Sequence, residues 1–76
     1  MSKRIPRVSG REAISAFYRL GFVEDRIKGS HHILVHPQTK VAISIPVHAG
    51  KSLGVGLLKS LLNAAGITVE EFVAQL

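Results

Sequence analysis

The apolar residues near the start of the chain recur with the period of a helix. They lie three or four positions apart, on one side of a helix: Ile14, Phe17 and Tyr18. Ser9 followed by Glu12 forms a capping box, and Gly21 suits a left-handed residue after the last helical turn. The pattern predicts a helix over residues 9–20.

The middle of the chain has the composition of β-strands, with turn residues between the segments. Residues 22–28, 31–36 and 41–45 are strand-like segments, separated by turns at 29–30 and 37–40. Pro46 ends the third strand or marks it as an edge strand, because proline cannot donate to a sheet. The short turns predict an antiparallel meander.

Two further helices are predicted after the strands. Leu58, Leu61, Leu62 and Ala65 give the buried stripe of one helix, which Gly66 ends. A second capping box, Thr68 with Glu71, opens a short third helix with its own apolar stripe: Val69, Phe72, Val73 and Leu76. The order α-β-β-β-α-α predicts an α+β fold of two layers, with the helices on one face of the sheet and the other face open to a partner.

Composition and charge limit the partners of this chain. Seventy-six residues without cysteine predict one domain (1–76) with a small core, in which residues 1–8 form a flexible basic N-terminus. A homodimer or a complex with another protein would supply additional burial. Ten Lys and Arg against five Asp and Glu give a net charge of +5, which favours a polyanion such as RNA. No secretory signal or membrane span is recognisable, so we expect a cytoplasmic protein.

Three of the four histidines lie in the stretch KGSHHILVHP. Neighbouring strand residues point to opposite faces, so His31 and His32 cannot bind one ion together. His32 and His36 share a face but lie roughly 13 Å apart, whereas zinc needs ligands about 2 Å away. We therefore expect neither a metal nor another cofactor. For His32 and His36 we expect the solvent face of the sheet or a contact to RNA or a partner, with His36 also holding the turn before Pro37.

His31 stands out through its neighbours. Lys28, Gly29 and Ser30 place a cation, a flexible backbone and a hydroxyl next to its imidazole, which titrates near neutral pH. Such a group could exchange protons with a ribose 2′-hydroxyl or a leaving oxygen. His48, in the later loop, could contact phosphate when protonated. A histidine beside a Gly-Ser turn can be a catalytic residue or simply an exposed one, and this motif by itself does not distinguish the two.

The ordered combination of KGSHHILVHP, ISIPVHAGKSL and LLKSLLNAAGI resembles the HicA-type (YcfA-like) toxin family over residues 9–67. The resemblance implies a metal-independent endoribonuclease (an mRNA interferase) of a toxin–antitoxin pair, with His31 as the catalytic residue. It also implies a HicB-type antitoxin as partner and mRNA as substrate. The expected order of elements, α-β-β-β-α-α, by itself resembles the fold of double-stranded-RNA-binding domains. The chain departs from the family at residues 54–57, Gly-Val-Gly-Leu, where Lys-Pro-Gly-Thr is common.

The resulting hypothesis makes His31 the general acid or base and the substrate's 2′-hydroxyl the nucleophile. Lys28, Lys51 and Arg26 would hold phosphate together with Gly29 and Ser30, and Lys59 would either extend this basic track or be a solvated helix residue. His32, His36 and His48 are candidate helpers for the second proton transfer. Two alternatives stay open: an RNA-binding module that cleaves nothing, and an inactive relative kept for antitoxin binding.

Overall fold

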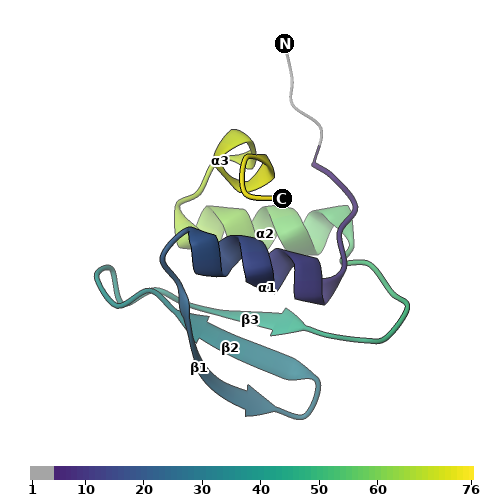
Figure 1. Cartoon of the computed structure of the whole chain (residues 1–76), viewed down its shortest axis with the longest axis horizontal. Helices are drawn as coiled ribbons and strands as arrows, with labels where there is room; N and C mark the ends of the chain where they lie inside the picture. The colour runs from purple at the N-terminus through teal and green to yellow at the C-terminus, as the bar shows by residue number, and fades with distance from the viewer. Residues whose placement is uncertain (1–4) are drawn as a thin grey trace.

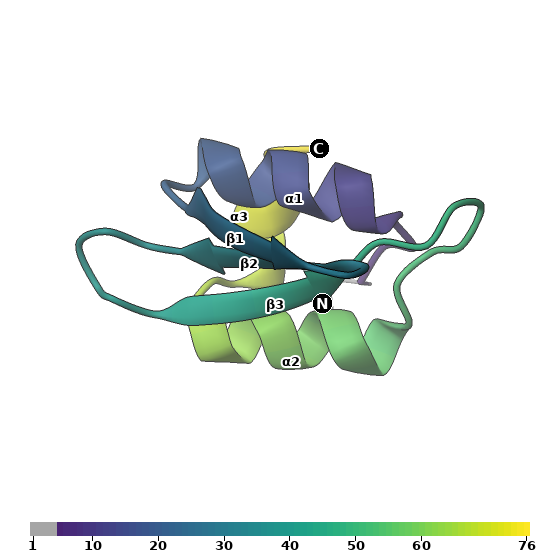
Figure 2. The same ribbon diagram turned by 90° about the horizontal axis from the view of Figure 1, so that it is seen from below.

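The computed structural model describes residues 5–76 and has the expected order of elements. The elements are α1 (Gly10–Arg19), β1 (Val23–Lys28), β2 (His31–Val35), β3 (Ala42–Pro46), α2 (Val55–Ala65) and α3 (Val69–Val73). The strands form one antiparallel sheet in the order β1-β2-β3 (Figure 1). The helices lie together on one side of it, so that strands cross in front of helices when the molecule is seen from below (Figure 2). The predicted α+β architecture is confirmed.

The strands differ from their predicted bounds by one residue at one or both ends. Phe22 precedes β1 and is buried in the core. His36 follows β2 and belongs to the turn. β3 starts and ends one residue later than expected, and its last residue is Pro46. Proline is tolerated there because β3 is an edge strand.

Both predicted capping boxes are present. The Ser9 hydroxyl accepts a hydrogen bond from the Glu12 N–H at 3.1 Å, and the Glu12 carboxylate accepts one from the Ser9 N–H at 2.8 Å. Thr68 and Glu71 make the same reciprocal pair at the start of α3. The hydrogen bonds from the Ser9 backbone and side chain hold the pKa of Glu12 below its ordinary value.

The core lies between the helices and the sheet and is organised around Phe17. The Phe17 ring lies 5.4 Å from the Phe22 ring and 5.5 Å from the Phe72 ring, measured between centroids. Leu34, Ile43 and Ile45 supply the sheet side of the core, and α2 adds its predicted stripe of leucines. In α3 the expected apolar stripe is wrong beyond Phe72, because Val73 and Leu76 are exposed.

The segment before α1 joins the core at its last residues. Residues 1–4, the basic start of the predicted flexible segment, lie outside the described part. Val8 is buried, and its carbonyl accepts a hydrogen bond from the Leu53 N–H at 2.7 Å. Ser9 forms a β-bridge with Ser52. These contacts join the start of α1 to the segment that leads into α2.

The departure from the family pattern at residues 54–57 leaves α2 intact but weakly capped. Gly54 occupies the N-cap position, where no side chain accepts a hydrogen bond. Gly66 ends the helix in the left-handed conformation, at φ 71°. Within residues 5–76 no helix is long and apolar enough to cross a membrane.

Replacing Gly56 by alanine should stabilise the protein, because a Cβ there meets no atom within 4 Å and alanine favours the helix. We expect a gain of about 0.4–1 kcal/mol, or roughly 2–8 °C in Tm. Thermal unfolding followed by circular dichroism measures it. Gly66→Ala is the matched control: its positive φ should make the same change cost roughly 1–2 kcal/mol. A loss of stability in Gly56→Ala would contradict the account of this helix start.

The capping box of α1 should make stability depend on pH in the acid range. Because folding lowers the pKa of Glu12 from 4.5, its carboxylate stabilises the fold above pH 4.5, and this contribution is lost as the pH falls through the lowered pKa. Denaturant unfolding of the wild type and of Glu12→Gln, across a pH series, should show a stability difference that shrinks in that window. A difference that stays constant with pH would contradict this assignment.

Candidate functional site

The pleat of β2 divides its two neighbouring histidines between the two faces of the sheet. His32 shares a face with the fully buried Leu34 and points towards the helices. His31 shares the other face with Ile33 and Val35, and it is exposed. The expectation that these two imidazoles point in opposite directions is therefore confirmed.

The open face carries a basic row at the end of the β1–β2 hairpin. Lys28 pairs with His31, and His31 pairs on its other side with Pro46. In antiparallel pairs, directly opposite side chains have Cβ atoms about 4.5–5.5 Å apart. The next row consists of Arg26, Ile33 and Ser44. Arg26 and Lys28 thus lie on the same face as His31.

An extra residue in β1 removes a carboxylate from this face. Regular alternation would place Glu24 on the same side as Arg26 and Lys28. The register shifts between Glu24 and Arg26, so Glu24 pairs with Leu34 and faces the helices. Such a bulge re-aims the side chains on one side of it. None of the residues paired on the open face is acidic, which leaves its cations without a competing carboxylate in the pairing rows.

Two backbone turns meet beside His31. Gly29 has φ 59°, as the first central residue of a type II′ hairpin turn requires, and nothing lies within 4 Å of a Cβ built there. The Ser30 carbonyl accepts a hydrogen bond from the Val47 N–H at 2.8 Å. This bond ties the hairpin turn to the loop that follows β3.

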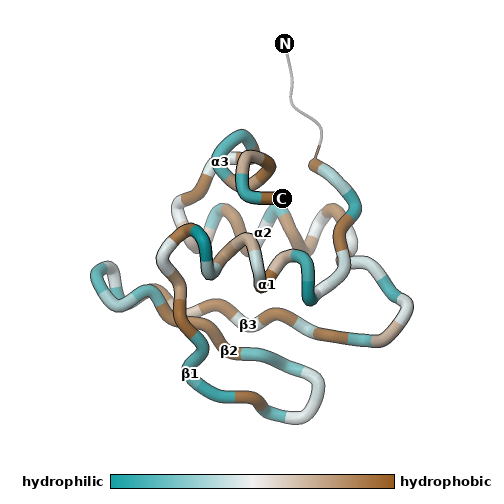
Figure 3. Tube along the Cα trace, viewed as in Figure 1, coloured by the Kyte–Doolittle hydropathy of each residue, from teal (hydrophilic) through white to brown (hydrophobic). Residues whose placement is uncertain are grey.

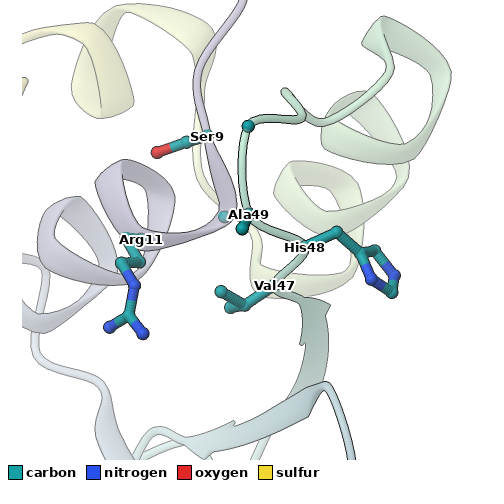
Figure 4. A pocket seen from close by; sticks show the side chains of 7 residues that line it. Ser9, Arg11, Val47, His48 and Ala49 are labelled. Carbon is teal, nitrogen blue, oxygen red and sulfur yellow. The ribbon is translucent and has the colours of Figure 1, made fainter.

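That loop carries His48 and Lys51, which are both exposed. The Lys51 N–H donates to the His48 carbonyl at 3.1 Å, and Gly50 takes φ 74° inside the turn. A hollow lies between this loop and the start of α1, lined in part by Ser9, Arg11 and Val47 (Figure 4). The His48 imidazole points away from Ser9 and Arg11. The structure therefore brings His48 and Lys51 to the end of the sheet where His31 lies.

His32 is not on the solvent face, contrary to expectation. Its Nδ1 lies 3.2 Å from Glu24 Oε1, and its side chain is 18% exposed. Tyr18 of α1 lines one hollow with Glu24 and His32. Partial burial, followed by the negative charge and the hydrogen-bonding capacity of the Glu24 carboxylate, raises the pKa of Tyr18. His32 thus belongs to a polar cluster between α1 and the hairpin.

His36 is a structural residue of the turn after β2. Its Nδ1 accepts hydrogen bonds from the Gln38 and Thr39 N–H groups at 3.2 and 3.4 Å, which agrees with its predicted role in the turn. Its ring lies 5.2 Å from that of Phe22, edge to face. A Cβ on Gly21 would come within 2.8 Å of its Nε2. The expected solvent-face position is wrong for His36 too, because the ring is half-buried on the helical side.

Lys59 is not brought to the hairpin. It is an exposed residue of α2, which packs on the helical side of β3, opposite the face that holds His31. Within residues 5–76, no group of three or more His, Asp or Glu side chains is arranged to hold a metal ion.

Sequence reasoning missed the roles of Glu24 and Tyr18. The apolar pattern places Tyr18 on the buried side of the first helix, whereas the residue is exposed. Tyr18 and Glu24 lie on different elements, and the bulge in β1 brings Glu24 to the hollow that both residues line. The signal that could have indicated the bulge is weak: "VED" places two consecutive carboxylates ahead of Arg26. No periodic pattern shows whether Glu24 or Asp25 points towards the helices.

Comparison with known proteins adds the family. The model of the HicA toxin of bacterial toxin–antitoxin systems matches residues 10–67, from the first residue of α1 to just beyond α2. No curated protein is similar enough to count as a relative. The match covers most of the chain and includes the hairpin with His31, the loop with His48 and the whole of α2. The chain therefore belongs to the HicA family of toxins of bacterial toxin–antitoxin pairs.

Proposed function

We propose that this toxin is a metal-independent endoribonuclease acting on mRNA, with His31 as its catalytic residue. The observation that carries the proposal is the open face of the sheet. An exposed imidazole lies there in one row with Lys28, beside the row of Arg26, with no acidic residue in the pairing rows. Family membership supports the same activity.

The chemistry follows from the groups on this face. His31 takes the proton from a ribose 2′-hydroxyl, and the 2′-oxygen attacks the adjacent phosphorus. The bond to the 5′-oxygen breaks, which leaves a 2′,3′-cyclic phosphate and a 5′-hydroxyl. Lys28 and Arg26 stabilise the charge that builds on the phosphate oxygens. Gly29 leaves room for the backbone to approach the phosphate.

The leaving 5′-oxygen needs a proton from a second group. Of the three candidate helpers, His32 faces the helices and His36 lies beyond the far end of β2. His48 follows Pro46, the cross-strand neighbour of His31, by two residues. We assign the second transfer to His48 or to water, and Lys51 from the same turn to a phosphate next to the cleaved one.

The partner follows from the family and from the same surface. A toxin of such a pair is held inactive by its antitoxin, and we propose that a HicB-type antitoxin covers the open face and His31. The alternative functions remain distinguishable by experiment: an RNA-binding module would bind without cleaving, and an inactive relative would bind the antitoxin alone.

His31→Ala should abolish RNA cleavage in the presence of EDTA and leave RNA binding in place. The wild type should release products with cyclic phosphate ends, and the variant should release none, because the proton acceptor is gone. Gel analysis of end-labelled RNA measures cleavage, and fluorescence anisotropy measures binding. Products with 5′-phosphates would contradict the mechanism. Binding without cleavage by either protein would favour the RNA-binding module.

RNA affinity should fall with salt according to the cations on the open face. In the His31→Ala protein, contacts from Arg26, Lys28 and Lys51 predict a slope of log affinity against log salt near about −2. Lys28→Gln should reduce the slope by about 0.7. Lys59→Gln is the matched control and should leave it unchanged, since Lys59 lies on the helical side. Binding that does not respond to salt would favour the protein-interaction function.

A further inference from the structure

The β1–β2 hairpin carries the proposed site but has little support from the helices. All six residues of β1 are exposed, and the helices pack mainly on β3. The hairpin projects away from the helical layer (Figure 1), and β1 is mostly hydrophilic while the hairpin tip is near the middle of the hydropathy scale (Figure 3). Apolar packing therefore fixes the hairpin to the core through Leu34, on the side away from the turn, and does little for β1 and the turn itself.

A cluster of polar side chains lies between the hairpin and α1 instead. The Glu24 carboxylate of β1 lies 3.2 Å from Nδ1 of His32 on β2, and it is near enough to Tyr18 of α1 to raise the pKa of that phenol. The three side chains line one hollow with Arg11 and Ser15. Glu24 is in this hollow because of the bulge, which turns it to the helical side. One polar residue from each of three elements thereby meets in this hollow, and the Glu24 carboxylate contacts the His32 ring there.

We propose that Tyr18, Glu24 and His32 are positioning residues that fix the direction of His31 on the opposite face. This inference rests on the proposed function. His32 is the next residue of β2 and shares a peptide plane with His31. Holding the His32 side chain against the helical side therefore limits how far this part of the strand can turn, and with it the direction of the His31 side chain. The same link holds Lys28, which pairs with His31, and so keeps the cation and the imidazole in one arrangement.

The inference gives different expectations for binding and for chemistry. Loss of the link removes none of the cations of the open face, so RNA still binds. It lets the hairpin move relative to α1, so the imidazole is less often aligned with the 2′-hydroxyl. A misplacement of about 1 Å can cost on the order of a hundredfold in rate. The maximal rate should therefore fall and KM should change little.

The test compares Tyr18→Phe, Glu24→Gln and their double variant, with RNA cleavage measured at saturating and limiting substrate. Tyr18→Phe removes one hydroxyl, and we expect kcat to fall by on the order of tenfold. KM should stay within about twofold. The double variant should lose little more than Glu24→Gln alone, because both changes break the same link. Ser15→Ala is the matched control, since it removes a hydroxyl from the same helix face and hollow.

Three outcomes are decisive. The inference is supported if kcat falls in the variants while Tm stays well above the assay temperature. It is overturned if the variants lose only thermal stability and cleave at the wild-type rate, because the link is then merely structural. If the wild type cleaves no RNA, the proposed function fails, and amide hydrogen exchange decides the inference separately. Exchange in residues 28–31 should then be faster in Tyr18→Phe than in Ser15→Ala, and equal rates would overturn it.

Discussion

The structure depends on the two-sided pairing of β2. As the central strand, it is hydrogen-bonded on both edges, so its pleat cannot slip by one residue without exchanging the two faces of the sheet. Leu34 fixes the choice, because it is fully buried against the helices. With Leu34 inside, His32 must face the helices and His31 must face the open side. Core packing at one residue thus decides where an imidazole three positions away points.

The bulge in β1 determines which charged side chains lie on each face of the sheet. It sends one carboxylate to the helical side, where Glu24 joins Tyr18 and His32, and it leaves Arg26 and Lys28 beside His31. One irregularity therefore serves two purposes. It takes Glu24 out of the pairing rows of the open face, and it brings the Glu24 carboxylate to His32 on the helical side.

The spacing of apolar residues was sufficient to predict the helices and the order of the strands, because each element repeats its apolar pattern several times. The leucine stripe of α2 and the two capping boxes are local patterns, and all are present as predicted. The placement of His31 on a face opposite to His32 also follows from strand geometry alone. Strand geometry does not show which of the two faces is covered by the helices. His32 and His36 are polar, so hydrophobicity gives no reason to expect them on the covered side. Their half-buried positions depend on partners, Glu24 and Phe22, that tertiary packing brings to them. The bulge is equally hidden, since Glu24 and Asp25 are interchangeable in any hydrophobic pattern.

The central claim is that RNA lies across the open face of the sheet, with His31 at the scissile phosphate. The most direct measurement is an NMR titration of the His31→Ala protein with a short single-stranded RNA, followed through backbone amide shifts. The account predicts the largest changes along the basic rows and the adjoining loop, at Arg26, Lys28, Ser44 and Lys51, with α1 and α2 little affected. Changes centred on the outer surfaces of the helices, with the hairpin unmoved, would contradict it.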